Sequence, residues 1–526
     1  MHAEADTREA AITPAAAARV GPLRWKAVWR APVQVLASAA LLGLAVPPDG
    51  ITVVAWVALV PLVLALQGKS PARAALLGAA FGAVSLAAMH PWFFALDGAN
   101  VFNTAALFGY LALYPALWCA ALAQLIRKKL PWVFPGAVLW VLLAWLRGHA
   151  GFLALPWDPL SHSQVGDLPL LQLAAFGGAD AIAFVVCLTN LALARAVEQR
   201  NLRSLAAPLA LLAAAHAAGY LRLHSAASTG DLAVALVQPA NEGAPRPERF
   251  RALVELTKEA ARSKPNLIVW PESAVQGFAF VPSVAESVAE ASGAADAPIL
   301  FGSADFGKYA KEAGDRAEQI EFKNEAFLML PDGTVRGPAV KNRLVPFAEY
   351  MPLAEYVAWP RWLVARQLHG IAGADPELIE LRDGIRLGVS ICWENFFTDL
   401  TRTLVDHGAA VIVQLSNDGD FGASAEPAQH NAASVLRAVE YGRSILIASA
   451  NGPSFAVDER GRIAGSPEPI GVRGWIRPVA RISSQITAYA RWRESWLWCF
   501  ALVAVAAVCR PRWISKRRIH EYPGPS

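Results

Sequence analysis

The distribution of apolar residues constrains this chain more than any other feature. Long apolar runs fill most of the sequence before residue 225 and return once near 496–510, with a stretch of ordinary charge density between them. Only 17% of the chain is charged, whereas an average soluble protein is about 25% charged. The pattern therefore predicts a membrane domain, then a soluble domain, then one closing span.

We expect eight membrane spans. They cover residues 33–48, 51–67, 73–95, 104–126, 131–147, 170–194, 205–222 and 494–510. A helix needs roughly 20 apolar residues to cross a bilayer. Several of these segments are shorter than that, so their boundaries are approximate.

Basic residues alternate with the expected spans. They precede span one and follow spans two, four, six and eight: Arg19, Arg24, Lys26, Arg30, Lys69, Arg73, Arg127, Lys128, Lys129, Arg195, Arg200, Arg203, Arg510, Arg512, Lys516, Arg517 and Arg518. The alternate loops at 47–50 and 97–103 contain no Lys or Arg. Because cytoplasmic loops are enriched in Lys and Arg, we predict that both termini are cytoplasmic and that the soluble domain faces outward.

The expected domain organisation follows from the spans and from the charge. We predict a disordered cytoplasmic tail over 1–30, a seven-span domain over 31–225, a soluble domain over 226–488, a closing span over 489–512 and a second cytoplasmic tail over 513–526. The net charge of +4 gives no reason to expect nucleic-acid binding. We expect the protein to be a monomer.

The soluble segment alternates short β-rich runs with helical stretches. Continuous apolar runs predict buried strands at 232–238, 266–273, 298–305, 385–392, 409–418 and 444–452. Helical spacing covers 246–263 and 427–442, and Pro331-Asp332-Gly333 provides the turn of a hairpin over 327–335. The pattern predicts an α/β sandwich with two layered sheets and helices outside.

Cys392 is the one cysteine of the soluble segment. The other four, Cys119, Cys187, Cys499 and Cys509, lie in or beside expected spans. Cys392 therefore has no disulfide partner within its own domain. Taken by itself it is more easily explained as a buried core thiol, since free cysteine is among the most buried residue types.

Three polar residues change this interpretation when they are taken together. Glu272 and Cys392 each follow a predicted buried strand, where enzymes with such sheets place their chemistry. Glu272 alone would be an ordinary strand-end carboxylate, and Lys341 alone an ordinary surface lysine. As a set, they predict acyl chemistry: the thiol attacks a carbonyl carbon, the carboxylate takes the thiol proton, and the ammonium stabilises the oxyanion.

The motifs around these residues resemble a known family. The segments "WPES" (270–273), "KNRLVPFAEY" (341–350) and "SICWEN" (390–395) resemble the Glu–Lys–Cys motifs of the nitrilase superfamily. More narrowly, they resemble the membrane-embedded apolipoprotein N-acyltransferase family. The segments 145–164, 416–422, 429–443 and 448–463 are similar to it as well. The resemblance implies an α-helical polytopic membrane domain with an α-β-β-α nitrilase-like domain in the periplasm, in the bacterial inner membrane.

The resemblance also implies roles for the matching residues. Glu272 would be the general base, Cys392 the nucleophile and Lys341 the oxyanion stabiliser. Trp393 would offer its amide as a second donor to the oxyanion.

Two further carboxylates match supporting positions of the family. Glu349 and Glu394 would hold the site in place.

No metal or other cofactor is expected, and His407 and His430 are assigned structural or surface roles.

The family reaction implied by the resemblance has two half-reactions. An acyl chain passes from a phospholipid of the phosphatidylethanolamine type to the thiol. It then passes from this thioester to the N-terminal amine of a diacylglyceryl-cysteine apolipoprotein.

The sequence departs from the family pattern at several positions outside the triad. Ala348, Arg343 and Ala144 stand where glycine, histidine and glutamate are usual, "QPAN" replaces Gln-Gly-Asn at 238–241, and Asp420 replaces a tryptophan. These departures put the lipid contacts and the acceptor in question.

Three hypotheses therefore stay open. The first is the N-acyltransferase, including a divergent paralogue with a different amine acceptor. The second is a membrane-anchored nitrilase-type amidase, in which water replaces the amine. The third is a non-enzymatic membrane scaffold, which an intact triad argues against.

Overall fold

The computed structural model describes residues 23–47, 50–96, 99–225, 230–241, 243–279, 281–306, 321–363, 369–382 and 384–509. The predicted tails therefore lie outside the described residues, except for 23–30, which begin the first helix.

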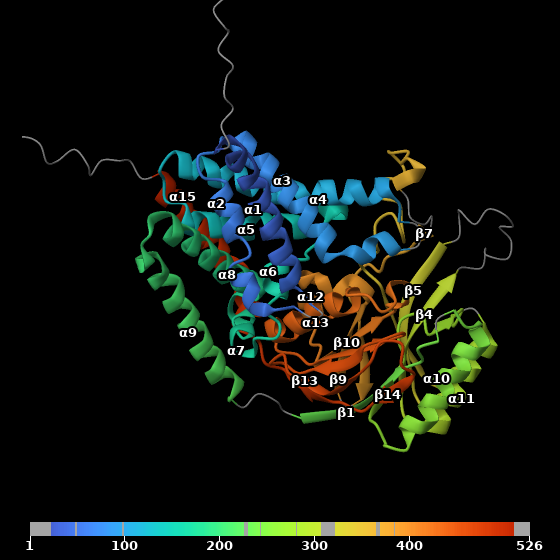
Figure 1. Cartoon of the computed structure of the whole chain (residues 1–526). Coiled ribbons are helices and arrows are strands. Elements are labelled where there is room, and N and C mark those ends of the chain that lie inside the picture. The colour runs from blue at the N-terminus through green and yellow to red at the C-terminus, as the bar shows by residue number, and fades with distance from the viewer. Residues whose placement is uncertain are drawn as a thin grey trace, which may run out of the picture.

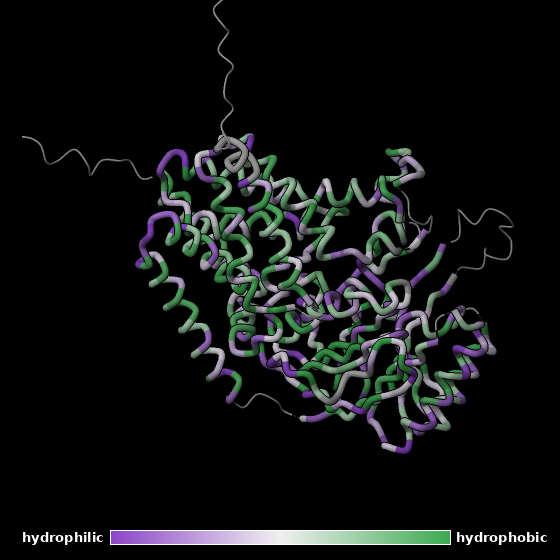
Figure 2. The backbone as a smooth tube through the Cα atoms, viewed as in Figure 1, coloured by the Kyte–Doolittle hydropathy of each residue, from purple (hydrophilic) through white to green (hydrophobic). Residues whose placement is uncertain are grey.

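The N-terminal part is helical and lies on one side of a two-sheet sandwich (Figure 1). Its helices are α1 (Leu23–Ala45), η1 (Thr52–Trp56), α2 (Val60–Ala65), α3 (Pro71–Met89), η2 (Pro91–Ala95), α4 (Val101–Arg127), α5 (Val133–Gly148), η3 (Gly151–Leu153), α6 (Pro159–His162), α7 (Leu168–Leu171), α8 (Ala174–Gln199), η4 (Leu202–Leu205) and α9 (Ala206–Leu223). The chain returns to this part with α14 (Ala488–Trp492) and α15 (Ser495–Cys509). Figure 2 shows that these helices are apolar along most of their length.

Four apolar segments of the described chain are long enough to cross a membrane. They are Pro71–Met89, Val101–Arg127, Ala174–Gln199 and Leu202–Leu223. Shorter apolar helical segments cover Arg30–Ala45, Thr52–Ala65, Val133–Gly148 and Ser495–Cys509. Each expected span thus coincides with apolar helix, although the second is divided between η1 and α2, the third between α3 and η2, and the sixth between α7 and α8. That all eight cross the bilayer stays a prediction.

Two helix features follow from the local sequence. Asn100 caps α4, because its side chain accepts from the backbone N–H of Asn103 while the Asn103 side chain accepts from that of Asn100. α8 is broken at Gly177 and Gly178, and Gly178 has a φ of 70° and a ψ of −177°. That backbone conformation is essentially restricted to glycine.

The soluble part contains two sheets within the described residues. The first has nine strands, with the order β14-β1-β2-β4-β5-β6 and with β15, β3 and β7 paired to β1, β4 and β5; the second has six, with the order β13-β12-β11-β10-β9-β8. The strands are β1 (Gly230–Gln238), β2 (Leu267–Val269), β3 (Val275–Gln276), β4 (Ile299–Phe306), β5 (Glu321–Met329), β6 (Val335–Val340), β7 (His369–Gly370), β8 (Leu378–Arg382), β9 (Ile385–Ile391), β10 (Val411–Ser416), β11 (Ile445–Ser449), β12 (Ser454–Val457), β13 (Ile463–Glu468), β14 (Gly474–Ile476) and β15 (Val479–Ile482).

The six predicted strands form the centres of both sheets. β1, β2 and β4 are neighbours and parallel, as are β9, β10 and β11. The facing sides of the two sheets form one apolar core that includes Leu236, Val269, Val389 and Val413. Parallel strands with both faces covered read as continuous apolar runs, which explains why these strands were recognisable in the sequence.

Helices cover both outer faces of the sheets. α10 (Arg246–Ala261) and α11 (Pro282–Ala295) pack on the first sheet, while α12 (Thr398–Asp406) and α13 (Glu426–Tyr441) lie on the side of the second sheet that faces the helical part (Figure 1). Two short helices, η8 (Cys392–Phe396) and η9 (Gly419–Phe421), follow β9 and β10, and η7 (Arg361–Leu363) precedes β7. The predicted α-β-β-α sandwich is confirmed.

α13 joins the two parts of the molecule. All of its residues but Ala428 are buried, and Val435, Leu436, Ala438 and Val439 belong to the same core as the helical part. Its Gln429 side chain donates to the carbonyl oxygens of Met89 and Pro47, at 2.8 and 3.1 Å, and accepts from Trp92. The soluble domain is therefore packed onto the helical part through polar as well as apolar contacts.

Candidate active site

Cys392 lies where a buried strand ends. β9 runs to Ile391, and Cys392 opens the short helix η8. The φ angle of Cys392 is 57°, in the left-handed region that residues with a side chain rarely adopt. Such a sharp turn at a strand end presents the thiol at the edge of the sheet, and its residue remains partly exposed.

Glu272 approaches from the other sheet. It follows β2 by three residues and is only 7% exposed. Its Oε1 accepts a hydrogen bond of 2.6 Å from Nδ2 of Asn324, which lies on β5. This bond fixes the direction of the carboxylate.

Lys341 lies between two carboxylates. It follows β6 directly, and its side chain is fully buried. Its Nζ is 2.8 Å from Oε1 of Glu349 and 3.9 Å from Oε1 of Glu272. Oε2 of Glu349 also accepts from the backbone N–H of Val345 at 2.7 Å, so Glu349 is held in place as well.

Glu394 ties the lysine loop to the cysteine loop. Its Oε1 accepts from the backbone N–H groups of Asn342 and Arg343, at 2.6 and 2.9 Å, and its Oε2 accepts from that of Ile391 at 2.8 Å. Trp393 contributes to the same link, because its indole N–H donates to the carbonyl oxygen of Arg343. The segments on either side of Cys392 and Lys341 are therefore held together through backbone groups.

The charges of the site act on one another. Burial, and then the negative charge of Glu272, raise the pKa of the Cys392 thiol well above its usual value, against the effect of Lys341. Burial also raises the pKa of the Glu272 carboxyl. Burial alone would lower the pKa of Lys341, but the charges of Glu349, Cys392 and Glu272 raise it above its usual value. The resting site therefore holds a protonated thiol and an ammonium ion beside the Glu272 carboxyl group.

A second polar cluster contacts the backbone carbonyl of Cys392. The Cys392 carbonyl oxygen accepts from the side-chain amide of Gln414 and from Nε2 of His430, the latter at 3.1 Å. Nδ1 of His430 lies 3.3 Å from Oδ1 of Asp418 and 3.8 Å from Oε1 of Glu426. Sequence reasoning gave His430 only a structural or surface role; the neighbouring Asp418 at the end of a predicted strand was the available signal.

The spacing of this cluster alone would suit a metal ion. The ligand atoms of Asp418, Glu426 and His430 all lie within 4.8 Å of one another. However, each nitrogen of His430 faces an oxygen acceptor, and an N–H on each satisfies both contacts. Neither nitrogen then has a lone pair for a metal.

Comparisons with known proteins decide the family. A family model described as "Apolipoprotein N-acyltransferase N-terminal domain" matches residues 38–192, and one described as "Carbon-nitrogen hydrolase" matches residues 233–471. The apolipoprotein N-acyltransferase of Geobacter metallireducens is 30% identical over 514 residues, which cover 92% of this chain and 95% of the relative. That of Methylococcus capsulatus is 31% identical over 502 residues, covering 90% and 94%.

The chain belongs to the apolipoprotein N-acyltransferase family. Its soluble part has the nitrilase-like fold expected from the motifs, and its apolar helices are consistent with a membrane protein. A solved amidase from Nesterenkonia sp. is similar at 15% identity with a TM-score of 0.38, over 52% of this chain and 98% of the amidase.

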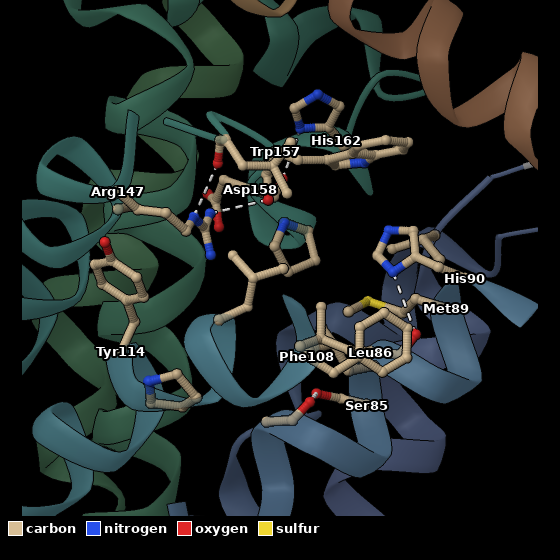
Figure 3. A pocket seen from close by; sticks show the side chains of 18 of the residues that line it. Ser85, Leu86, Met89, His90, Phe108, Tyr114, Arg147, Trp157, Asp158 and His162 are labelled. Atoms are coloured by element: carbon tan, nitrogen blue, oxygen red, sulfur yellow. Dashed lines mark hydrogen bonds between the residues drawn. The ribbon is translucent and has the colours of Figure 1, made fainter. Parts of the chain in front are cut away.

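An apolar pocket lies in the helical domain of this family member. Side chains of α1, α3, α4 and α5 line an empty volume of about 1030 Å³, part of which is open to solvent. Figure 3 shows Arg147, Asp158 and His162 toward one end, and apolar side chains such as Phe108 and Leu86 toward the other. The Arg147 guanidinium donates to the carbonyl oxygens of Leu155 and Trp157, at 3.1 and 2.9 Å.

Stacked rings connect this pocket to the catalytic domain. Trp157, which lines the pocket, stacks on Phe396 with ring centres 4.5 Å apart, and Phe396 stacks on His430 at 5.4 Å. One aromatic column thus runs from the pocket wall to the residue that contacts the Cys392 carbonyl.

The departures from the usual family pattern have different structural roles. Gln238 is buried and binds the backbone around Pro469, Val472 and Ser454. Arg343 forms an exposed ion pair with Asp399.

The remaining departures lie at three places. Ala144 lines the pocket, where its small side chain leaves space. Ala348 lies in the turn between Lys341 and Glu349, partly buried. The Asp420 side chain lies outside the described part of the structure.

Proposed function

We propose that this protein transfers an acyl chain from a membrane phospholipid to the N-terminal amine of a diacylglyceryl-cysteine apolipoprotein through a thioester on Cys392. The meeting of Glu272, Lys341 and Cys392 carries the proposal. Family membership supports the type of reaction.

In the first half-reaction the Cys392 thiol gives its proton to the Glu272 carboxylate, and the sulfur attacks the ester carbonyl carbon of the donor. The Lys341 ammonium stabilises the oxyanion, and the Trp393 amide is proposed as a second donor. When the tetrahedral intermediate collapses, the lysophospholipid oxygen leaves and takes the proton from Glu272. The acyl chain remains on sulfur as a thioester.

In the second half-reaction the acceptor amine attacks the thioester carbon. Glu272 accepts a proton from this amine, and Lys341 again stabilises the oxyanion. The C–S bond breaks, an amide forms, and the thiolate recovers its proton from Glu272. Because the thioester stores the acyl group, the lysophospholipid can leave before the second lipid substrate binds.

The pocket in the helical domain supports a lipid donor. Its apolar wall suits a hydrocarbon chain, while Arg147 marks a cationic end suited to a phosphate group. A donor of the phosphatidylethanolamine type, dissolved in the same bilayer, would reach it without crossing water.

Acyl capture tests the proposal. Purified protein is incubated with a phospholipid labelled in its sn-1 acyl chain, and the label on the protein is then treated with neutral hydroxylamine, which cleaves thioesters. We expect a hydroxylamine-sensitive label on Cys392, and its release as a labelled amide when a diacylated lipopeptide is added.

Two variants serve as controls. Cys392→Ala should take up no label, whereas Cys499→Ala, which changes an exposed thiol on α15, should label like the wild type. An unlabelled wild-type protein that releases ammonia from small amides would refute acyl transfer and support the amidase hypothesis.

A further inference from the structure

The backbone of Cys392 needs support from its neighbours. A positive φ of 57° is unfavourable for a residue with a side chain and persists only where the surroundings hold it. Two side chains, Gln414 and His430, donate to the Cys392 carbonyl oxygen. Since the direction of the thiol follows from this backbone conformation, both contacts act on the nucleophile indirectly.

The contacts of His430 define its protonation state. Nε2 faces the carbonyl of Cys392, which can only accept, and Nδ1 faces the carboxylate of Asp418. A neutral imidazole has one N–H and the imidazolium ion has two. Two N–H groups satisfy both contacts at once.

We propose that His430 is a positioning residue for the nucleophile: as a buried imidazolium ion between Asp418 and Glu426, it fixes the Cys392 carbonyl and thereby the direction of the thiol. The inference rests on the proposed acyl transfer through Cys392.

The charges around His430 balance. The hydroxyl groups of Ser416 and Ser449 donate to the side-chain oxygens of Asp418, at 2.6 and 3.0 Å. In Glu426, Oε2 is buried and has no hydrogen-bond partner among the described residues. Burial raises the pKa of Glu426 to about 8, so this carboxyl is protonated at neutral pH. One imidazolium and one carboxylate then leave the cluster neutral, which suits its burial.

Few charged groups contact the ring. Its face stacks on the apolar Phe396, and among the described residues the titratable groups that face it are Asp418 and Glu426. Burial alone would lower the pKa of His430, but the hydrogen bond to Asp418, the charge that Glu426 carries once it loses its proton near pH 8, and the Cys392 carbonyl raise it to about 9. The imidazolium form therefore persists through neutral pH.

Single-turnover labelling of Cys392 with phospholipid tests the proposal. We expect His430→Ala to slow thioester formation at least about tenfold, since a misdirected nucleophile lowers the rate of the chemical step. The half-saturating phospholipid concentration should change less than about twofold, because binding energy is untouched. In His430→Gln the side-chain amide can still donate to the Cys392 carbonyl, so the rate should return to within about threefold of the wild type.

The pH profile supplies a readout that packing alone would not move. Deprotonation of His430 removes the N–H that contacts Asp418, so we expect the wild-type rate to fall near pH 9. Asp418→Asn removes the negative charge that favours imidazolium and should shift this fall to lower pH. An unshifted profile would overturn the assignment.

Several other results would overturn the proposal. One is an unchanged rate in His430→Ala; another is equal loss in both His430 variants together with equally lowered melting temperatures. A third is one equivalent of divalent metal per chain whose removal by EDTA abolishes labelling. If the wild type forms no thioester, the proposed function fails, but alkylation of Cys392 by iodoacetamide still decides the inference: equal rates in wild type and His430→Ala would refute it.

Discussion

Lys341 owes its charge and position to Glu349. The two groups are 2.8 Å apart, and the carboxylate is the largest influence that opposes the effect of burial on the pKa of the lysine. In Glu349→Gln the ammonium loses this partner and shifts relative to the oxyanion. We expect kcat for acyl transfer to fall between about tenfold and a hundredfold, as small displacements of catalytic groups do.

A matched substitution separates this effect from a general loss of charge. Glu255 lies on α10 and forms an exposed ion pair with Arg473. Glu255→Gln should leave kcat within about twofold of the wild type, since exposed ion pairs contribute little. Full activity in Glu349→Gln would show that Lys341 does not depend on Glu349.

The coupling between Glu272 and Cys392 predicts opposite effects on two measurements. The charge of Glu272 raises the pKa of the thiol, so Glu272→Gln should lower that pKa while removing the base. Acyl transfer should be lost, yet the pH midpoint for alkylation of Cys392 by iodoacetamide should move to lower pH. A midpoint that moves up, or stays, would contradict the proposed arrangement.

Glu272 and Cys392 were recognisable because each lies at the end of an apolar run, whereas Lys341 was recognisable only from the motif in which it lies. The side chains that contact these candidates were not recognisable from the sequence. Asn324 lies within β5 and His430 within α13, where a polar residue has many possible roles and only the packing of distant segments assigns one. The cluster behind Cys392 depends on the contact of α13 with η8, which sequence spacing does not encode.

At the scale of elements, Glu440 links α13 to α8. After the break at Gly177 and Gly178, α8 resumes at Ala179, whose backbone N–H donates to Oε1 of Glu440 at 2.7 Å. The same carboxylate pairs with Arg437 at 2.6 Å. A carboxylate at the N-terminus of a helix stabilises the helix, because it accepts a hydrogen bond from a free backbone N–H and interacts favourably with the helix dipole.

We predict that Glu440→Ala lowers the free energy of unfolding by about 3–5 kcal/mol, because it leaves the buried Arg437 without its partner. Thermal unfolding in detergent would measure this. The exposed Glu290 on α11 supplies the control: Glu290→Gln should change stability by less than about 0.5 kcal/mol. Equal melting temperatures for the two variants would refute the role of Glu440.

Strands buried on both faces were predictable, whereas several strands near the ends of the sheets were not. The central strands are continuous apolar runs, so periodicity and length identified them. β13, β14 and β15 have mixed or partial burial and lie near the ends of their sheets, where no apolar pattern marks them. The division of the second expected span into η1 and α2 has the same cause, because an apolar run does not reveal where a helix is interrupted.

For the whole molecule, the arrangement in the membrane is a prediction. The alternation of basic loops places both termini in the cytoplasm and the catalytic domain outside. Protease added to spheroplasts should therefore cleave the catalytic domain but not a tag at the C-terminus. In inverted vesicles the tag should be removed and the catalytic domain protected; the reverse pattern would refute the orientation.

α13 has a consequence for how the protein must be made. A helix that is buried along almost its whole length offers little surface to water, and part of the core around it comes from the helices that precede the soluble segment. We therefore expect the sandwich to need the helical part for its stability. During synthesis it would then reach its final packing after the preceding helices are in place, so we expect the candidate catalytic centre to be completed late.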